Sequence, residues 1–107
     1  GGDLSLSLGN VSLWPEGRRV EVEGRELALL KKEFDILLYF MNRPERLVNK
    51  STLAESVWGD HIDQVDNYDF IYAQIKNLRK KLEDDPKQPV YICTVHGMGY
   101  KFGGFRE

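Results

Sequence analysis

The side chains best suited to chemistry lie on one face of the segment from about Asn67 to Glu83. At 100° per residue of a helix, Ala73, Asn77 and Lys80 lie opposite an apolar stripe. Lys76 lies on one side of this group. Amides can pair with adenine, an ammonium can reach guanine or a phosphate, and a methyl group can pack on thymine. The face therefore suits the major groove of DNA, although an ordinary solvated helix face carries the same residue types.

A second polar group lies near the C-terminus, where Thr94, His96, Tyr100 and Lys101 surround a Gly-x-Gly turn. Glycine lets the tip of a turn approach another surface closely, and the flanking groups can contact phosphates or a minor groove. The alternative stays open that the glycines only close a hairpin and that Tyr100 belongs to the core.

Other kinds of chemistry find little support. Cys93 and His96 are two residues apart, but two ligands without a second pair make a poor metal site. The acidic segment 60–69 lacks the glycine and the terminal glutamate of a calcium-binding EF-hand. No grouping of Ser, His and Asp or of Cys and His indicates nucleophilic catalysis. We therefore expect no metal, no cofactor and no enzymatic activity.

The charge is unevenly distributed along the chain. The formal net charge of −2 for 107 residues by itself disfavours a nucleic-acid partner. Residues 72–106, however, carry seven Lys and Arg against three Asp and Glu, whereas residues 1–71 carry eight against thirteen. Because the local field decides where a polyanion binds, the C-terminal third remains a candidate surface for one.

Length and composition indicate one small domain. No apolar run approaches the ~20 residues that cross a bilayer, and the single cysteine fits a reducing cytoplasm. We expect residues 1–3 to be a linker or a cloning remnant and residues 4–105 to form the domain.

The N-terminal part has the two-residue period of short strands. Apolar residues alternate with polar ones at 4–8, 11–13 and 20–22, and glycine-containing turns separate these runs and a further short run at 25–27. The pattern predicts a four-stranded antiparallel sheet.

A helical period follows. It predicts a central helix from about Leu30 to Asn42 and a second helix from Lys50 to Trp58, with Asn49 as its N-cap. A third helix over about 67–83 buries Ile71, Ile75, Leu78 and Leu82, and a hairpin with strands at 90–95 and 100–102 ends the chain. The expected fold class is α+β.

The order of these motifs resembles the OmpR/PhoB family of winged-helix effector domains. The similar segments are Leu78-Arg79-Lys80-Lys81-Leu82 and the run from Thr94 to Tyr100, which reads TVHGMGY. Upstream, residues 32–38 and 47–59 are similar to the family's first two helices. The resemblance covers nearly the whole chain and implies a winged helix-turn-helix fold.

The resemblance also implies a function. It makes residues 67–83 a recognition helix for the major groove and residues 94–101 a wing on the flanking minor groove and backbone. Together with the helix face, it gives these candidate DNA-binding residues: Ala73, Gln74, Lys76, Asn77, Arg79, Lys80, Lys81, Thr94, His96, Tyr100 and Lys101. Arg79 lies close to the apolar stripe, so it is either a phosphate contact or a member of an internal ion pair.

The partners implied by the resemblance are double-stranded DNA with direct repeats, RNA polymerase, an N-terminal receiver domain and a sensor kinase acting through it. The loop expected to meet the polymerase contains Asp60, His61, Asp63 and Asp66. The isolated domain is expected to be a monomer and the full-length protein a dimer. The competing hypothesis is a winged helix that binds an acidic protein and reads no DNA.

Three positions depart from the family pattern. Leu30 stands where the family often has a helix-capping Thr, Tyr72 where it has an acidic residue, and His96 where the wing often has an Arg. A neutral imidazole lacks the charge that favours a narrow minor groove, so we expect the wing to bind more weakly.

Overall fold

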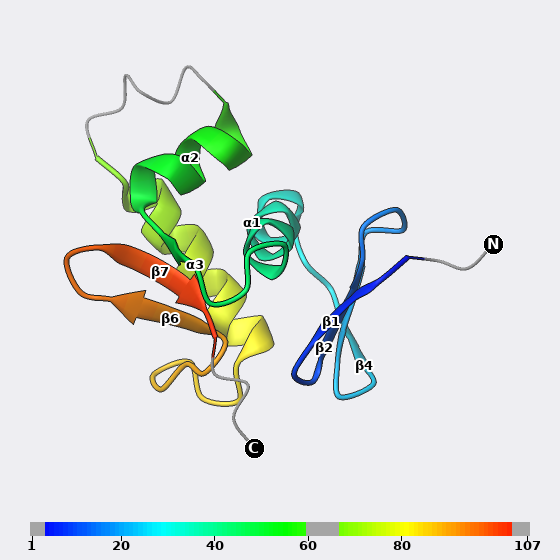
Figure 1. The fold of residues 1–107 in the computed structure, drawn as a ribbon. Coiled ribbons are helices and arrows are strands. Elements are labelled where there is room, and N and C mark those ends of the chain that lie inside the picture. The colour runs from blue at the N-terminus through cyan, green and yellow to red at the C-terminus, as the bar shows by residue number, and fades with distance from the viewer. Residues whose placement is uncertain (1–3, 60–66, 104–107) are drawn as a thin grey trace.

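The computed structural model describes residues 4–59 and 67–103, which form two sheets and three helices (Figure 1). The elements occur in this order: β1 (Leu6–Leu8), β2 (Val11–Trp14), β3 (Arg19–Val22), β4 (Arg25–Leu27), α1 (Lys31–Met41), β5 (Leu47–Val48), α2 (Lys50–Trp58), α3 (Asp69–Leu82), β6 (Ile92–Val95) and β7 (Gly99–Phe102). The α+β prediction is confirmed. Within the described ranges, no helix has both the length and the apolar character that crossing a bilayer requires.

The N-terminal sheet is antiparallel, with its strands in the order β1-β2-β3-β4. Val11 and Leu13 of β2 pair with Val22 and Val20 of β3, and all four side chains are buried. The predicted alternation is therefore correct for these strands. The first strand is shorter than predicted, because Leu4 lies outside β1 with 86% of its surface exposed.

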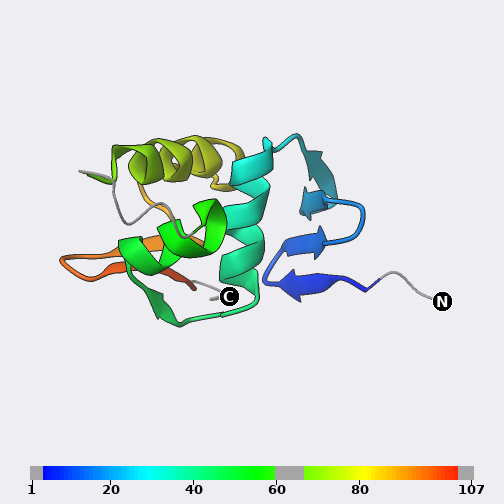
Figure 2. The same ribbon diagram turned by 90° about the horizontal axis from the view of Figure 1, so that it is seen from above.

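Helix α1 lies between the N-terminal sheet on one side and α2, α3 and the C-terminal hairpin on the other (Figure 2). Phe34, Ile36, Leu37 and Phe40 of α1 are at most 2% exposed. A helix packed on two sides must be apolar around much of its circumference. The prediction of a central helix is confirmed, with Leu30 and Asn42 as its caps.

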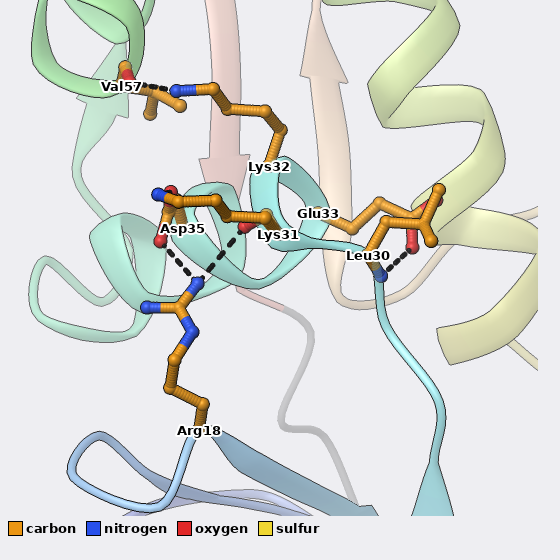
Figure 3. A network of polar contacts seen from close by, with 7 residues as sticks. All are labelled: Arg18, Leu30, Lys31, Lys32, Glu33, Asp35 and Val57. Carbon is orange, nitrogen blue, oxygen red and sulfur yellow. Dashed lines mark hydrogen bonds and ion pairs between the residues drawn. The ribbon is translucent and has the colours of Figure 1, made fainter.

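The start of α1 is joined to the N-terminal sheet by Arg18, from the turn between β2 and β3 (Figure 3). Arg18 Nη2 donates to Asp35 Oδ1 at 2.8 Å and to the Lys31 carbonyl oxygen at 3.2 Å. Burial pushes the pKa of Asp35 upward, but the hydrogen bonds and charges of Arg18 and Lys31 outweigh it and hold that pKa below its usual value. The charged carboxylate thus fixes the sheet against α1.

The same turn of α1 also contacts the two other helices. Lys32 Nζ donates to the Val57 carbonyl oxygen of α2 at 2.8 Å. Glu33 Oε1 accepts the Leu30 N–H at 2.8 Å and also the ammonium of Lys81, from α3, at 2.7 Å. The absence of a side-chain cap at Leu30, expected from the sequence, is confirmed, and Glu33 takes over the capping of this N–H.

The C-terminal sheet has three strands in the order β5-β7-β6, and β5 was not predicted. Leu47 and Val48 pair with Lys101 and Tyr100, so the wing hairpin is joined to the segment that precedes α2. Gly99 permits this pairing: its φ is +142°, and a Cβ there would overlap the Val48 carbonyl group and lie 2.8 Å from the Asn49 Cα.

Candidate nucleic-acid interface

Helix α3 presents the two faces that its periodicity predicts. Ile71, Ile75, Leu78 and Leu82 are at most 2% exposed and pack into the core. The helix is shorter than the predicted 67–83, because the Asn67 side chain accepts the Asp69 N–H just before the first turn and Leu82 is the last helical residue. In the part of the chain that the structure describes, no helix or strand covers the face opposite the stripe.

The outer face of α3, defined here as Ala73, Lys76, Asn77 and Lys80, consists of exposed residues. Neither lysine forms an ion pair with any residue of the described ranges. The structure therefore places four of the predicted DNA-binding residues together, with their charges and their amide open to a partner. Arg79, another basic residue of this helix, has different surroundings.

Arg79 lies on the flank of α3 that faces the wing. Its Nε and Nη2 both donate to the Ile92 carbonyl oxygen, at 3.0 and 2.6 Å, and Nη2 also donates to Thr94 Oγ1 at 3.0 Å. Its guanidinium carbon lies 5.8 Å from the centroid of the Tyr100 ring. Of the two roles considered for Arg79, the structure favours an internal one, although its partners are a carbonyl and a hydroxyl and not an acid.

Glu83, the C-cap of α3, accepts hydrogen bonds from the backbone at and before the start of β6. Its two carboxylate oxygens accept the backbone N–H groups of Val90, Tyr91 and Ile92 at 2.8–3.1 Å, and the residue is 6% exposed. The strand predicted for residues 90–95 starts at Ile92 and is two residues shorter than predicted.

The flank of α3 that faces α1 contains two more predicted site residues. Lys81 is paired with the buried Glu33, and about a third of the Lys81 side chain remains exposed. Gln74 is half-buried, and its Oε1 is buried without a hydrogen-bond partner among the described residues. Further along this flank, Phe70 packs edge-on against Trp58 with ring centroids 4.9 Å apart, so Trp58 acts as a packing residue between α2 and α3.

The predicted wing residues are placed differently from one another. Thr94 and His96 are exposed, whereas Tyr100 is 6% exposed and burial raises the pKa of its phenol. The core alternative for Tyr100 thus has the stronger support. Lys101 lies on the opposite face of β7 from Tyr100, because side chains alternate along a strand. It lines a hollow with Cys93 and Asn10, away from the outer face of α3.

Tyr72 stands where the sequence pattern led us to expect an acid, and its partner could not be predicted. The hydroxyl of Tyr72 accepts a hydrogen bond from Lys50 Nζ, at the start of α2, at 2.8 Å. That hydrogen bond raises the pKa of Lys50. Sequence reasoning missed Lys50 as a member of this surface, since only the packing of α2 on α3 brings it there.

Four predicted residues of the polymerase loop, Asp60, His61, Asp63 and Asp66, lie outside the described residues. Within the described ranges, no group of three or more His, Cys, Asp or Glu side chains is arranged to hold a metal ion.

Asn49 acts as the predicted N-cap of α2, accepting the Thr52 N–H at 2.8 Å.

The three helices are followed by a hairpin, and the third helix exposes a cationic, amide-bearing face beside it. This arrangement defines a winged helix-turn-helix domain. The chain belongs to the family described as "Transcriptional regulatory protein, C terminal", whose sequence profile matches residues 24–102. These domains belong to transcription regulators and are not enzymes, in agreement with the sequence prediction.

Two curated relatives illustrate the family. The sensory transduction protein RegX3 of Mycolicibacterium smegmatis is 38% identical over 102 residues, which are 95% of this chain and 44% of RegX3. The alkaline phosphatase synthesis transcriptional regulatory protein SphR of Synechococcus elongatus is 41% identical over 93 residues, which are 87% of this chain and 35% of SphR. The chain thus spans less than half the length of these relatives.

Two solved structures have the same fold. The Thermotoga maritima response regulator DrrB, an OmpR/PhoB homologue, matches 94% of this chain and 44% of its own with a TM-score of 0.82 and 34% identity. The Klebsiella pneumoniae RstA DNA-binding domain, solved in complex with the RstA box, matches 94% of this chain and 97% of its own with a TM-score of 0.83 and 29% identity. The predicted resemblance to OmpR/PhoB domains is confirmed.

Proposed function

We propose that residues 4–105 are a module that binds double-stranded DNA sequence-specifically, with α3 in the major groove and the hairpin β6-β7 on the flanking minor groove. The observation that carries the proposal is the exposed outer face of α3, where an amide and two ammonium groups without an ion-pair partner among the described residues lie beside the wing. Major-groove base edges are recognised by such groups, and phosphates by such charges. The complex of the RstA domain with its DNA box supports the same use of the fold.

Within this proposal the candidate residues have separate tasks. Ala73 and Asn77 contact base edges, and Lys76 and Lys80 contact bases or phosphates. Thr94 and His96 reach the backbone and minor groove from the wing. Arg79, Lys81 and Tyr100 support the surface from within, because their polar groups or rings already have internal partners.

We further propose that the full-length protein is the cytoplasmic output component of a two-component system. A receiver domain preceding this module and a sensor kinase acting on it would control pairing of two copies on direct repeats. The names and greater lengths of the RegX3 and SphR relatives support this assignment. The acidic segment 60–66 is proposed to contact RNA polymerase.

The test compares two substitutions on duplexes selected from a random pool. Asn77→Ala is expected to relax preference at one base pair, at a cost of about 1–3 kcal/mol on the preferred sequence. Lys80→Ala is expected to weaken all sequences alike. If the parent domain shows no salt-dependent binding to any duplex, the module binds no DNA, and the competing function, contact with an acidic protein, takes its place.

A further inference from the structure

A groove of about 540 Å³ runs between α3 and the wing. Its floor contains the buried side chains of Ile75 and Tyr100, and its rim carries exposed lysines from α3 and from the loop that follows it. The lining residues are Tyr72, Ile75, Lys76, Arg79, Lys80, Asp85, Pro86, Lys87 and Tyr100. The groove thus combines an apolar, aromatic floor with a cationic rim.

Three lysines supply the charges of this rim. Lys76, Lys80 and Lys87 form no ion pair with a described residue. The one acid of the lining, Asp85, uses its Oδ1 to accept the Lys87 backbone N–H at 3.0 Å. A polyanion with uncharged segments between its charges is complementary to this surface, and the sugar–phosphate chain of DNA, with a deoxyribose between successive phosphates, is such a polyanion.

Lys50 adds a further cation at the Tyr72 end of the groove. Its ammonium donates to the Tyr72 hydroxyl at 2.8 Å and lies 5.4 Å from the centroid of the Tyr72 ring. A neutral phenol positions the ammonium without cancelling its charge, whereas a carboxylate in the same place would cancel it. Lys50 therefore keeps its full charge while being held at one position.

The two ends of the groove are set by α3. Tyr72 lies one turn from the start of the helix, and Lys80 lies eight residues further, a rise of roughly 12 Å. Pro86 and Lys87 follow the end of the helix. The groove therefore runs along α3, with Lys50 at one end and Lys87 at the other.

This inference rests on the proposed function. When a helix occupies a major groove and an adjacent wing occupies the flanking minor groove, one sugar–phosphate strand separates the two elements. We propose that this strand lies in the groove between α3 and the wing, and that Lys50, positioned by Tyr72, and Lys87 bind its phosphates at the two ends. Neither lysine belongs to the recognition helix or to the wing.

The experiment measures the salt dependence of binding to a mixed-sequence duplex by fluorescence anisotropy. Each phosphate contact contributes about −0.9 to the slope of log K against log salt. Lys50→Gln and Lys87→Gln are each expected to make this slope about 0.9 less steep and to weaken binding several-fold at low salt. Lys50→Arg is expected to keep the slope of the parent. Tyr72→Asp is expected to make the slope less steep, as Lys50→Gln does.

The matched control is Arg25→Gln, which removes one exposed cation from β4, on the far side of α1 from α3 (Figure 2). Its slope is expected to equal that of the parent. If Lys50→Gln and Lys87→Gln also keep the parent slope while the parent binds DNA, the groove does not hold the strand and only this inference fails. If the parent itself does not bind, the proposed function fails as well.

Discussion

The outer face of α3 and the two flanks of the same helix carry similar cations in different surroundings. Lys76 and Lys80 on the outer face are exposed and have no acidic partner within the described part of the chain. Arg79 and Lys81, the immediate neighbours of Lys80, are bonded to β6 and to Glu33. Successive residues of a helix lie 100° apart around its axis. The charge of Lys80 is therefore open to a partner, whereas Arg79 and Lys81 on either side of it bond within the domain.

The flanks determine where the outer face lies. Arg79 and Glu83 fix the end of α3 to the first residues of β6, one through a carbonyl oxygen and the other through backbone N–H groups. Lys81 fixes the opposite flank to α1. The orientation of the face relative to the wing therefore depends on three side chains that need not touch DNA. Substitutions on the flanks and on the face should have different signatures.

The largest effect is expected where the wing meets β5. Gly99→Ala would place a methyl group into the Val48 carbonyl at a φ of +142°, which side chains rarely adopt. We expect a loss of at least about 3 kcal/mol in the free energy of unfolding. Urea denaturation followed by circular dichroism measures it. Gly97→Ala, at the open tip of the same turn, is the control with the smaller loss, and equal losses at the two positions would contradict this account of Gly99.

The next effect is expected at the flank that faces α1. Lys81→Gln leaves the Glu33 carboxylate, which is 1% exposed, without its cationic partner. We expect the free energy of unfolding to fall by about 2–3 kcal/mol, less than for a fully buried pair because Lys81 keeps some contact with water. Lys80→Gln should change stability by less than about 0.5 kcal/mol. Equal stability of the two variants would show that the Glu33–Lys81 pair does not support the helix.

The smallest effect is expected at the flank that faces the wing. Arg79→Lys keeps the charge but cannot make the forked bonds to the Ile92 carbonyl and Thr94. DNA affinity should fall several-fold while the salt slope stays unchanged, since the wing loses its position and no phosphate contact is lost. Arg79 would instead be a phosphate contact if Arg79→Lys kept the DNA affinity of the parent and Arg79→Gln made the slope of log K against log salt less steep.

Local patterns in the sequence were sufficient for the helices and for the open face. The spacing of Ile71, Ile75, Leu78 and Leu82 located the buried stripe of α3, and therefore also the opposite face. Asn49 marked the start of α2 through its side-chain acceptor. These features depend on residues within a few positions of each other, which is the range over which periodicity and capping act.

The contacts that the flank residues make could not be predicted from such local patterns. Lys81 and Glu33 are 48 residues apart, and Arg79 meets a carbonyl whose position depends on how the loop after α3 folds back. The two-residue strand β5 is too short to show a period, and only its pairing with β7 defines it. The contact between Lys50 and Tyr72 likewise requires the packing of α2 on α3.

The most direct test compares the salt dependence of DNA binding for Lys80→Gln and Lys81→Gln, two adjacent substitutions with the same change in charge. The account predicts that Lys80→Gln makes the slope about 0.9 less steep, and that Lys81→Gln, measured where it is folded, keeps the parent slope. Equal reductions for the two variants, or a reduction for Lys81→Gln alone, would contradict the assignment of the outer face of α3 as the surface that meets DNA.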